Sequence, residues 1–115
     1  MILRKEYNFE AAHFIYNHPG KCKSLHGHTY RLFVSVEGPV NPETGMVIDF
    51  YDLSKIVQEK IIVQLDHRFL NEIIPLSTAE NISAWIWNQL KPSLPNLLQL
   101  ELFETADNCV IHRGV

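Results

Sequence analysis

Alternation of apolar and polar side chains predicts a β-strand over residues 2–14. Side chains of one parity share a face, because successive residues of a strand point to opposite sides of the sheet. Charged and amide side chains occupy the other parity, so the first face should cover a core. The inward-facing row is Leu3, Tyr7, Phe9, Ala11 and His13. His13 therefore continues an apolar row, where a polar ring needs a partner.

A second strand is indicated by the β-branched and aromatic side chains from about residue 28 to residue 37. The stretch 15–24 before it is rich in turn-forming residues and is typical of a loop. If His26 and His28 open the strand, their spacing of two places both imidazoles on one face. Cys22 lies upstream in the loop, so its thiol need not be a ligand and is free to do chemistry.

A first helix should begin at Asp49 or Asp52, either of which can be its N-cap, and should end near Leu65. A short strand, or a strand edge, is expected just before it at residues 46–50. The helix has apolar positions at helical spacing, which predicts one face against a core. That stripe is Leu53, Ile56, Val57, Lys60 and Ile61.

A second helix should open with a capping box from Ser77 to Glu80, and Pro92 should close it. Its expected buried stripe is Ile82, Trp85, Ile86 and Leu90. A further strand follows, with Leu98, Leu100 and Leu102 on its inward face. Glu104 shares their parity, so a carboxylate would end an inward-facing row. Residues 109–112 form a last short strand.

The order of these elements predicts an α+β fold in one domain, residues 1–115. The sheet would be antiparallel, with both helices on one face. The other face of the sheet would be exposed in a monomer, and an oligomer would bury it.

Composition narrows the function classes. With 115 residues, of which 46% are hydrophobic, the chain suits one soluble core and not a disordered segment. No apolar run approaches the roughly 20 residues of a membrane span, and the charged N-terminus does not resemble a signal peptide, so a cytoplasmic protein is expected. The net charge of −3 does not indicate the basic surface that nucleic-acid binding requires. Two cysteines do not make a disulfide framework and are expected as free thiols.

Three histidines with an open fourth position describe a catalytic zinc site, and His13, His26 and His28 are the candidates. A histidine pair at a strand end can also simply bind water or backbone. The remaining histidines compete for the third place: His18, His67 and His112.

Asp66 and His67 have two interpretations. His67 can favour the negative end of the preceding helix dipole. Alternatively, Asp66 orients an imidazole that takes the proton of a thiol. Lys21 and Lys23 flank Cys22 and would favour its thiolate.

Several motifs, in order along nearly the whole chain, resemble the family of 6-pyruvoyltetrahydropterin synthase and 6-carboxytetrahydropterin synthase. They are Phe9-Glu-Ala-Ala-His13, Cys22-x-x-x-His26-Gly-His28, Gly45-Met-Val-Ile-Asp49-Phe50, Leu65-Asp66-His67-x-x-Leu70-Asn71, Thr78-Ala-Glu80-Asn81 and Glu104-Thr105. The cysteine–histidine motif is the most specific of them. Ser77 departs from the family, since many members have proline there, although serine still caps a helix.

The resemblance implies site roles for nine residues. His13, His26 and His28 would hold Zn²⁺. Cys22, Asp66 and His67 would form a catalytic triad. Glu104 would anchor the pterin, and Thr78 and Glu80 would lie near the pterin pocket.

The resemblance also implies the tunnelling fold, in which four-stranded antiparallel sheets of several subunits join into a barrel. The usual assembly is a homohexamer, a dimer of trimers, with active sites at subunit interfaces. This assembly would cover the exposed sheet face.

Within the family, the short chain, the segment Trp85-Ile-Trp87-x-Gln89 and the ending Cys109-Val-Ile-His112-Arg113-Gly114 resemble the 6-carboxytetrahydropterin synthase branch. That branch converts 7,8-dihydroneopterin triphosphate to 6-carboxy-5,6,7,8-tetrahydropterin, acetaldehyde and triphosphate, toward 7-deazaguanine (queuosine-type) tRNA bases. The biopterin branch eliminates triphosphate from the same substrate. The residues also leave open a structural-zinc protein and a pterin-binding module without catalysis.

Overall fold

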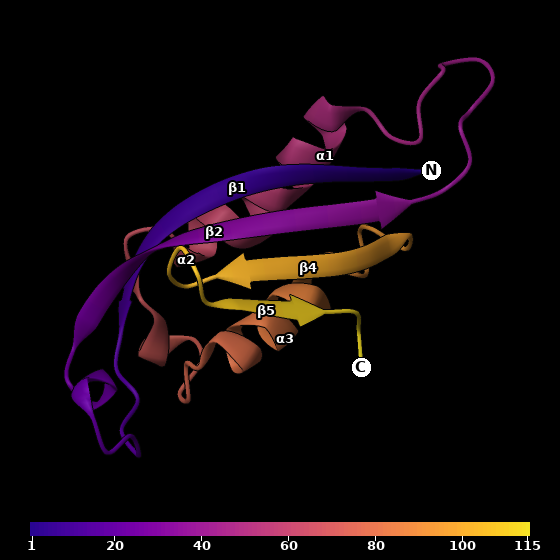
Figure 1. The fold of residues 1–115 in the computed structure, drawn as a ribbon. Coiled ribbons are helices and arrows are strands. Elements are labelled where there is room, and N and C mark those ends of the chain that lie inside the picture. Colours follow the sequence, from indigo (N-terminus) through magenta and orange to yellow (C-terminus); the bar gives the residue numbers. More distant parts are fainter.

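Strand β2 (His26–Glu37) lies at the centre of a five-stranded sheet in the computed structural model, which describes residues 1–115. The strand order is β3-β1-β2-β4-β5, and every pairing is antiparallel except that of β1 with β3. Figure 1 shows the sheet in front and the helices α1 (Phe50–Val57) and α3 (Ala79–Leu90) behind it. The other strands are β1 (Ile2–His13), β3 (Arg68–Phe69), β4 (Leu97–Phe103) and β5 (Cys109–His112).

Strands β1 and β2 form a long hairpin whose register runs from Ile2 opposite Glu37 to His13 opposite His26. The loop 14–25 joins them and contains a short 3₁₀ turn, η1 (Lys21–Lys23). The inward row of β1 is buried from Tyr7 onward, as its alternation predicts. The hairpin thus brings two histidine-bearing strand ends together.

The first helix begins where the sequence predicts. Asp49 is the N-cap of α1 (Phe50–Val57), and its carboxylate accepts the Tyr51 N–H at 2.7 Å. The helix continues through a π-helical turn, η2 (Gln58–Ile62), into α2 (Val63–Leu65). A π turn holds one residue more than an α turn. Two consecutive isoleucines, Ile61 and Ile62, are buried in it.

The expected strand at residues 46–50 is not formed. The chain closes a local loop there instead: the Asn41 N–H donates to the Met46 carbonyl at 2.8 Å. Gly45 lies in that loop with a φ of +73°, which favours glycine. The segment then leads directly into the cap of α1, so it has no strand partner.

The sheet has one strand more than the four that the tunnelling-fold resemblance implies. The additional strand, β3, has only two residues and pairs with Ala11 and Ala12 of β1. Two residues are too few to show a strand period in sequence. Beyond β3 the chain makes a 3₁₀ turn, η3 (Leu70–Glu72), before α3 (Ala79–Leu90).

The inward face of β4 differs by one residue from its prediction. Leu97, Leu100 and Leu102 are buried, whereas Leu98 is half-exposed. The register of β2 and β4 shifts between Ser35 and Val36. Such an irregularity places neighbouring residues out of strict alternation, so Leu97 and not Leu98 faces the core.

The capping box predicted from Ser77 is wrong by one position. The N-cap of α3 is Thr78, whose hydroxyl accepts the Asn81 N–H at 3.2 Å. Ser77 is buried, and its hydroxyl and carbonyl oxygens lie against the His13 ring. Threonine serves as a cap almost as well as serine, whereas the buried ring of His13 needs a polar partner.

The two layers enclose one hydrophobic core of 21 buried residues. α3 contributes Ile82, Ile86 and Leu90, which are fully buried, while Trp85 is partly buried. None of the helices has the length and apolar character needed to span a bilayer.

The helix-free face of the sheet is charged. Arg4 of β1 reaches across β2 to Glu101 of β4 with two hydrogen bonds, at 2.7 and 3.0 Å. Its guanidinium also lies 3.9 Å from the ring centre of Phe33. Arg31 pairs with Glu6 in the same way across one strand pair. These ion pairs connect side chains of different strands on the face of the sheet that no helix covers.

Removing the cap of α3 should lower stability. The variant Thr78→Ala should reduce the free energy of unfolding by about 1 kcal/mol, because the Asn81 N–H loses its acceptor. Thr78→Ser, which keeps a hydroxyl, should stay close to the parent chain. Urea denaturation followed by circular dichroism measures both. Equal stability of the alanine variant and the parent would contradict the assignment of Thr78 as the cap.

Candidate metal centre and catalytic residues

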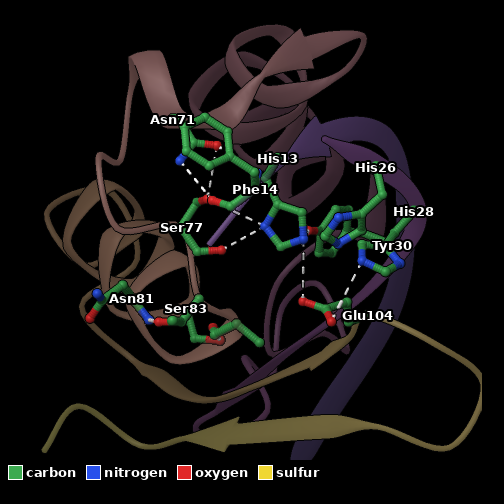
Figure 2. A network of polar contacts seen from close by, with 12 residues as sticks. His13, Phe14, His26, His28, Tyr30, Asn71, Ser77, Asn81, Ser83 and Glu104 are labelled. Carbon is green, nitrogen blue, oxygen red and sulfur yellow. Dashed lines mark hydrogen bonds and ion pairs between the residues drawn. The ribbon is translucent and has the colours of Figure 1, made fainter. Parts of the chain in front are cut away.

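Three histidine side chains converge at the end of the β1–β2 hairpin. His13 comes from β1, and His26 and His28 come from β2. One ring nitrogen of each lies within 4.8 Å of those of the other two. The ring centres are 4.6 to 5.1 Å apart, and the rings meet edge to face (Figure 2). The structure therefore brings together the three histidines that the sequence suggests for a metal.

Backbone carbonyls orient two of these rings. His13 Nδ1 lies 2.8 Å from the Ser77 carbonyl oxygen, and His26 Nδ1 lies 2.7 Å from that of Ser24. A carbonyl oxygen only accepts, so Nδ1 carries the proton in both rings. Nε2 is then unprotonated and carries the lone pair, as in histidines that ligate metals through Nε2.

His28 supplies the strongest sign that the cluster suits a metal ion. Its Nε2 is buried and has no hydrogen-bond partner. A buried polar atom without a partner is costly and calls for an explanation. A divalent ion held by three imidazoles would satisfy it, since neutral imidazole is a good ligand for zinc. The donor set and the orphaned nitrogen therefore fit zinc.

Burial favours the neutral form of two of the rings. Desolvation lowers the pKa of His13 and of His28 below the ordinary histidine value, although the nearby Glu104 carboxylate opposes this in both. The neighbouring imidazoles act in the same direction as burial. A lowered pKa favours the unprotonated ring, which is the form that binds metal.

Glu104 follows β4 and points at the cluster. Its two carboxylate oxygens lie 3.8 Å from His13 Nε2 and 3.6 Å from His28 Nε2, beyond hydrogen-bond length. Figure 2 shows the carboxylate beside both rings. Glu104 also lines a hollow of about 350 Å³ together with Glu80 and Asp107. The carboxylate is thus placed between the histidines and a cavity.

Of the two residues expected near that hollow, Glu80 is exposed and lines it, whereas Thr78 is occupied as the helix cap. Tyr30, which no sequence motif marked as a site residue, is buried beside the cluster. Its hydroxyl lies 3.4 Å from His13 Nε2, and burial raises its pKa. Its parity with His26 and His28 on β2 was the signal that could have found it.

Asp66 and His67 form a hydrogen-bonded pair at the edge of β1. Asp66 accepts the His67 ring N–H at 3.0 Å and the Glu10 N–H at 2.9 Å. These two bonds, the Glu10 N–H first, hold the pKa of Asp66 below its usual value. The Asp66 carboxylate thus orients the imidazole through Nδ1 and leaves Nε2 free.

The backbone of His67 is strained. Its φ is +58°, which is rare for a residue with a side chain, and such a conformation costs about 1–3 kcal/mol. The His67 N–H donates to the Glu10 carbonyl at 2.6 Å, which holds the residue in place. The side chain is 78% exposed and lines a hollow of about 540 Å³ with Glu10 and Thr29. Strain of this kind is concentrated at functional sites.

Cys22 lies in the turn η1, within the loop that joins the two histidine strands. Its side chain is half-buried, and its sulfur makes no hydrogen bond. The structure therefore does not join Cys22, Asp66 and His67 into one hydrogen-bonded triad within a single chain.

The fold is that of solved structures of 6-pyruvoyl tetrahydropterin synthases. The structure of 6-pyruvoyl tetrahydropterin synthase from Caenorhabditis elegans is similar to this chain, with a TM-score of 0.91, 28% identity, and coverage of 100% of this chain and 96% of that chain. The chain belongs to the 6-pyruvoyl tetrahydropterin synthase family, whose sequence model matches residues 2–115.

Relatives from both branches of the family are similarly close. The 6-pyruvoyl tetrahydrobiopterin synthase of Dictyostelium discoideum is 35% identical over 130 residues, covering 99% of this chain and 96% of the relative. The 6-carboxy-5,6,7,8-tetrahydropterin synthase of Synechocystis sp. is 40% identical over 112 residues, covering 91% and 87%. The chain is therefore a member of a family of tetrahydropterin synthases.

Replacing one ring of the cluster should abolish tight metal binding. We expect His26→Ala to lose stoichiometric Zn²⁺ after dialysis, because two imidazoles leave the ion without its third protein ligand. The control His112→Ala changes a ring that packs on Trp87 outside the cluster, and it should keep the metal. Elemental analysis measures both variants. Equal zinc content in the two would refute the metal centre.

Proposed function

We propose that the chain is a zinc-dependent 6-carboxy-5,6,7,8-tetrahydropterin synthase acting on 7,8-dihydroneopterin triphosphate. The observation that carries the proposal is the three-histidine cluster with an unpartnered buried nitrogen, next to the Glu104 carboxylate, in a chain of this family. Zinc, when bound, would polarise substrate hydroxyls as a Lewis acid. The remaining roles fall to side chains.

His13, His26 and His28 would hold the zinc. Glu104 would accept the ring N–H and amino hydrogens of the pterin from the hollow that it lines, with paired charge-assisted hydrogen bonds. This arrangement would place the substrate side chain toward the histidines, since the carboxylate lies under 4 Å from two of them.

Cys22 would act as a thiolate base that removes a proton from the substrate side chain. His67, oriented by Asp66, would take up that proton and return it. Because the three residues do not meet within one chain, a neighbouring subunit would supply the Asp66–His67 pair. Active sites at subunit interfaces, which the family resemblance implies, accommodate this division.

The shape of the chain supports an oligomer. Its extents are 54 × 24 × 23 Å, and its radius of gyration is 15.1 Å, against about 13 Å for a compact chain of this length. The hairpin and the helix-free sheet face are the parts that a neighbouring subunit would cover. A homohexamer built as a dimer of trimers, the assembly expected from the resemblance, is the proposed state.

The alternative function is that of a 6-pyruvoyltetrahydropterin synthase, which the identity to the Dictyostelium relative favours. The carboxy branch is preferred because the segments 85–89 and 109–114 resemble it. Coverage of the relatives does not separate the branches, since this chain covers 96% of the Dictyostelium relative and 87% of the Synechocystis relative. Both branches would use the same site residues for the first proton transfers.

Product analysis tests the proposal directly. Incubation of the zinc-loaded protein with 7,8-dihydroneopterin triphosphate should yield 6-carboxytetrahydropterin and acetaldehyde, identified by mass spectrometry. Cys22→Ala should retain zinc and bind a pterin but lose turnover, because the substitution removes the proposed thiolate base. A 6-pyruvoyl product would assign the other branch, and full activity of Cys22→Ala would remove the cysteine from the mechanism.

Glu104→Gln should weaken pterin binding about tenfold or more, because a charged acceptor of paired hydrogen bonds becomes a neutral amide. The change should appear as a raised KM and as a raised Kd in fluorescence titration with a pterin. Glu59→Gln, an exposed position in the π turn, is the matched control and should behave as the parent chain. An unchanged Kd for Glu104→Gln would contradict the anchoring role.

A further inference from the structure

The segment 75–77, which leads into α3, is held by side chains at every residue. It belongs to no helix or strand, yet each of its three backbone carbonyls accepts a side-chain hydrogen bond. The pairs are Asn71 Nδ2 with the Pro75 oxygen at 3.0 Å, Asn81 Nδ2 with the Leu76 oxygen at 2.8 Å, and His13 Nδ1 with the Ser77 oxygen at 2.8 Å. The last of these bonds ends on a metal-site histidine.

Asn71 uses its full hydrogen-bonding capacity in this network. Its Nδ2 donates to the carbonyls of Phe14, at 2.9 Å, and Pro75. Its Oδ1 accepts the Phe14 N–H at 3.0 Å and the Ser77 hydroxyl at 3.2 Å. Because carbonyls can only accept and the Phe14 N–H can only donate, the amide has one possible orientation. Asn71 thereby fastens the segment to the residue that follows His13.

The direction of the Ser77 hydroxyl follows from that orientation. Its hydrogen goes to Asn71 Oδ1, so its oxygen can only accept from His13 Nδ1, which lies 3.3 Å away. The Ser77 carbonyl also accepts from Nδ1. Two acceptors of one residue therefore face the same nitrogen, and the proton of the His13 ring is fixed on Nδ1.

We propose that Asn71 and Ser77 are positioning residues for the metal centre. They hold the buried ring of His13 in one orientation and one tautomer, with the Nε2 lone pair aimed at His26 and His28. The inference rests on the zinc centre of the proposed function and adds the residues that prepare its least accessible ligand. His26 obtains its carbonyl partner two residues away on the chain, whereas His13 depends on a segment more than 60 residues distant.

Zinc affinity tests the proposal. Partners that orient a ligating histidine typically contribute 10–100-fold to metal affinity. Asn71→Ala should therefore weaken zinc binding by at least about tenfold. Ser77→Ala, which keeps the carbonyl, should weaken it by about two- to tenfold. Competition with a chromophoric chelator measures both. Ser83→Ala is the matched control, since Ser83 is a buried serine whose hydroxyl bonds only Ala79 within α3.

Nuclear magnetic resonance of the metal-free protein provides a readout that needs no zinc. Long-range ¹H–¹⁵N spectra should show the His13 proton on Nδ1 in the parent chain, and mixed tautomers in Asn71→Ala. If the parent bound no zinc, the proposed function would fail, while these spectra would still decide the orientation of His13.

Two outcomes would overturn the proposal. One is an Nε2-protonated His13 in the metal-free parent. The other is zinc affinity in Ser77→Ala and Asn71→Ala equal to that of Ser83→Ala. If circular dichroism shows that Asn71→Ala does not fold, Ser77→Ala and the parent spectra decide the matter.

Discussion

The register of the β1–β2 hairpin is the constraint on which the site depends. It places His13 opposite His26 as the last pair of the ladder. Because strand side chains alternate, a slip of one residue would send the imidazoles of β2 to the opposite face from that of His13. The buried stack of Phe9 on Tyr30, with ring centres 4.9 Å apart, fixes the pairing just before the cluster. A hydrophobic contact thus decides where the polar chemistry lies.

Around this hairpin, other elements of the fold each add one group to the site. The hairpin supplies three rings, β4 ends with the Glu104 carboxylate, and the segment before α3 supplies the carbonyl of Ser77. The Asp66–His67 pair is separate from them, at the edge of β1, with its own strained backbone. The helical layer positions both parts, because α2 leads into Asp66 and α3 begins beside Ser77.

Sequence patterns predicted the main outline of the fold because they rest on local periodicity. The alternation of β1 placed His13 inward, and Asp49 marked the start of α1. The predictions that failed depend on tertiary contacts. The register shift between β2 and β4 leaves Leu98 of β4 unpaired, so Leu97 faces the core in its place. Ser77 contacts the buried ring of His13 and does not cap the helix. The two-residue strand β3 forms only because β1 offers a free edge.

The candidate site was predictable for a similar reason, and only in part. Histidines at a spacing of two on one strand share a face whatever the rest of the chain does. The network behind them has no such local sign: Asn71 and His13 are joined through Ser77, and Ser77 lies 64 residues from His13 in the sequence. Residues that act through backbone carbonyls leave no pattern of side-chain types.

The π-helical turn of residues 58–62 has a consequence for the geometry of the edge pair. An α-helix advances by about 100° per residue, so one inserted residue rotates everything beyond it by that angle. The extra residue therefore sets the direction in which the chain leaves α2. That direction places Asp66 beside the Glu10 N–H and precedes the left-handed backbone of His67. Shortening that turn by a single residue would keep every side chain of the pair and still aim both away from β1.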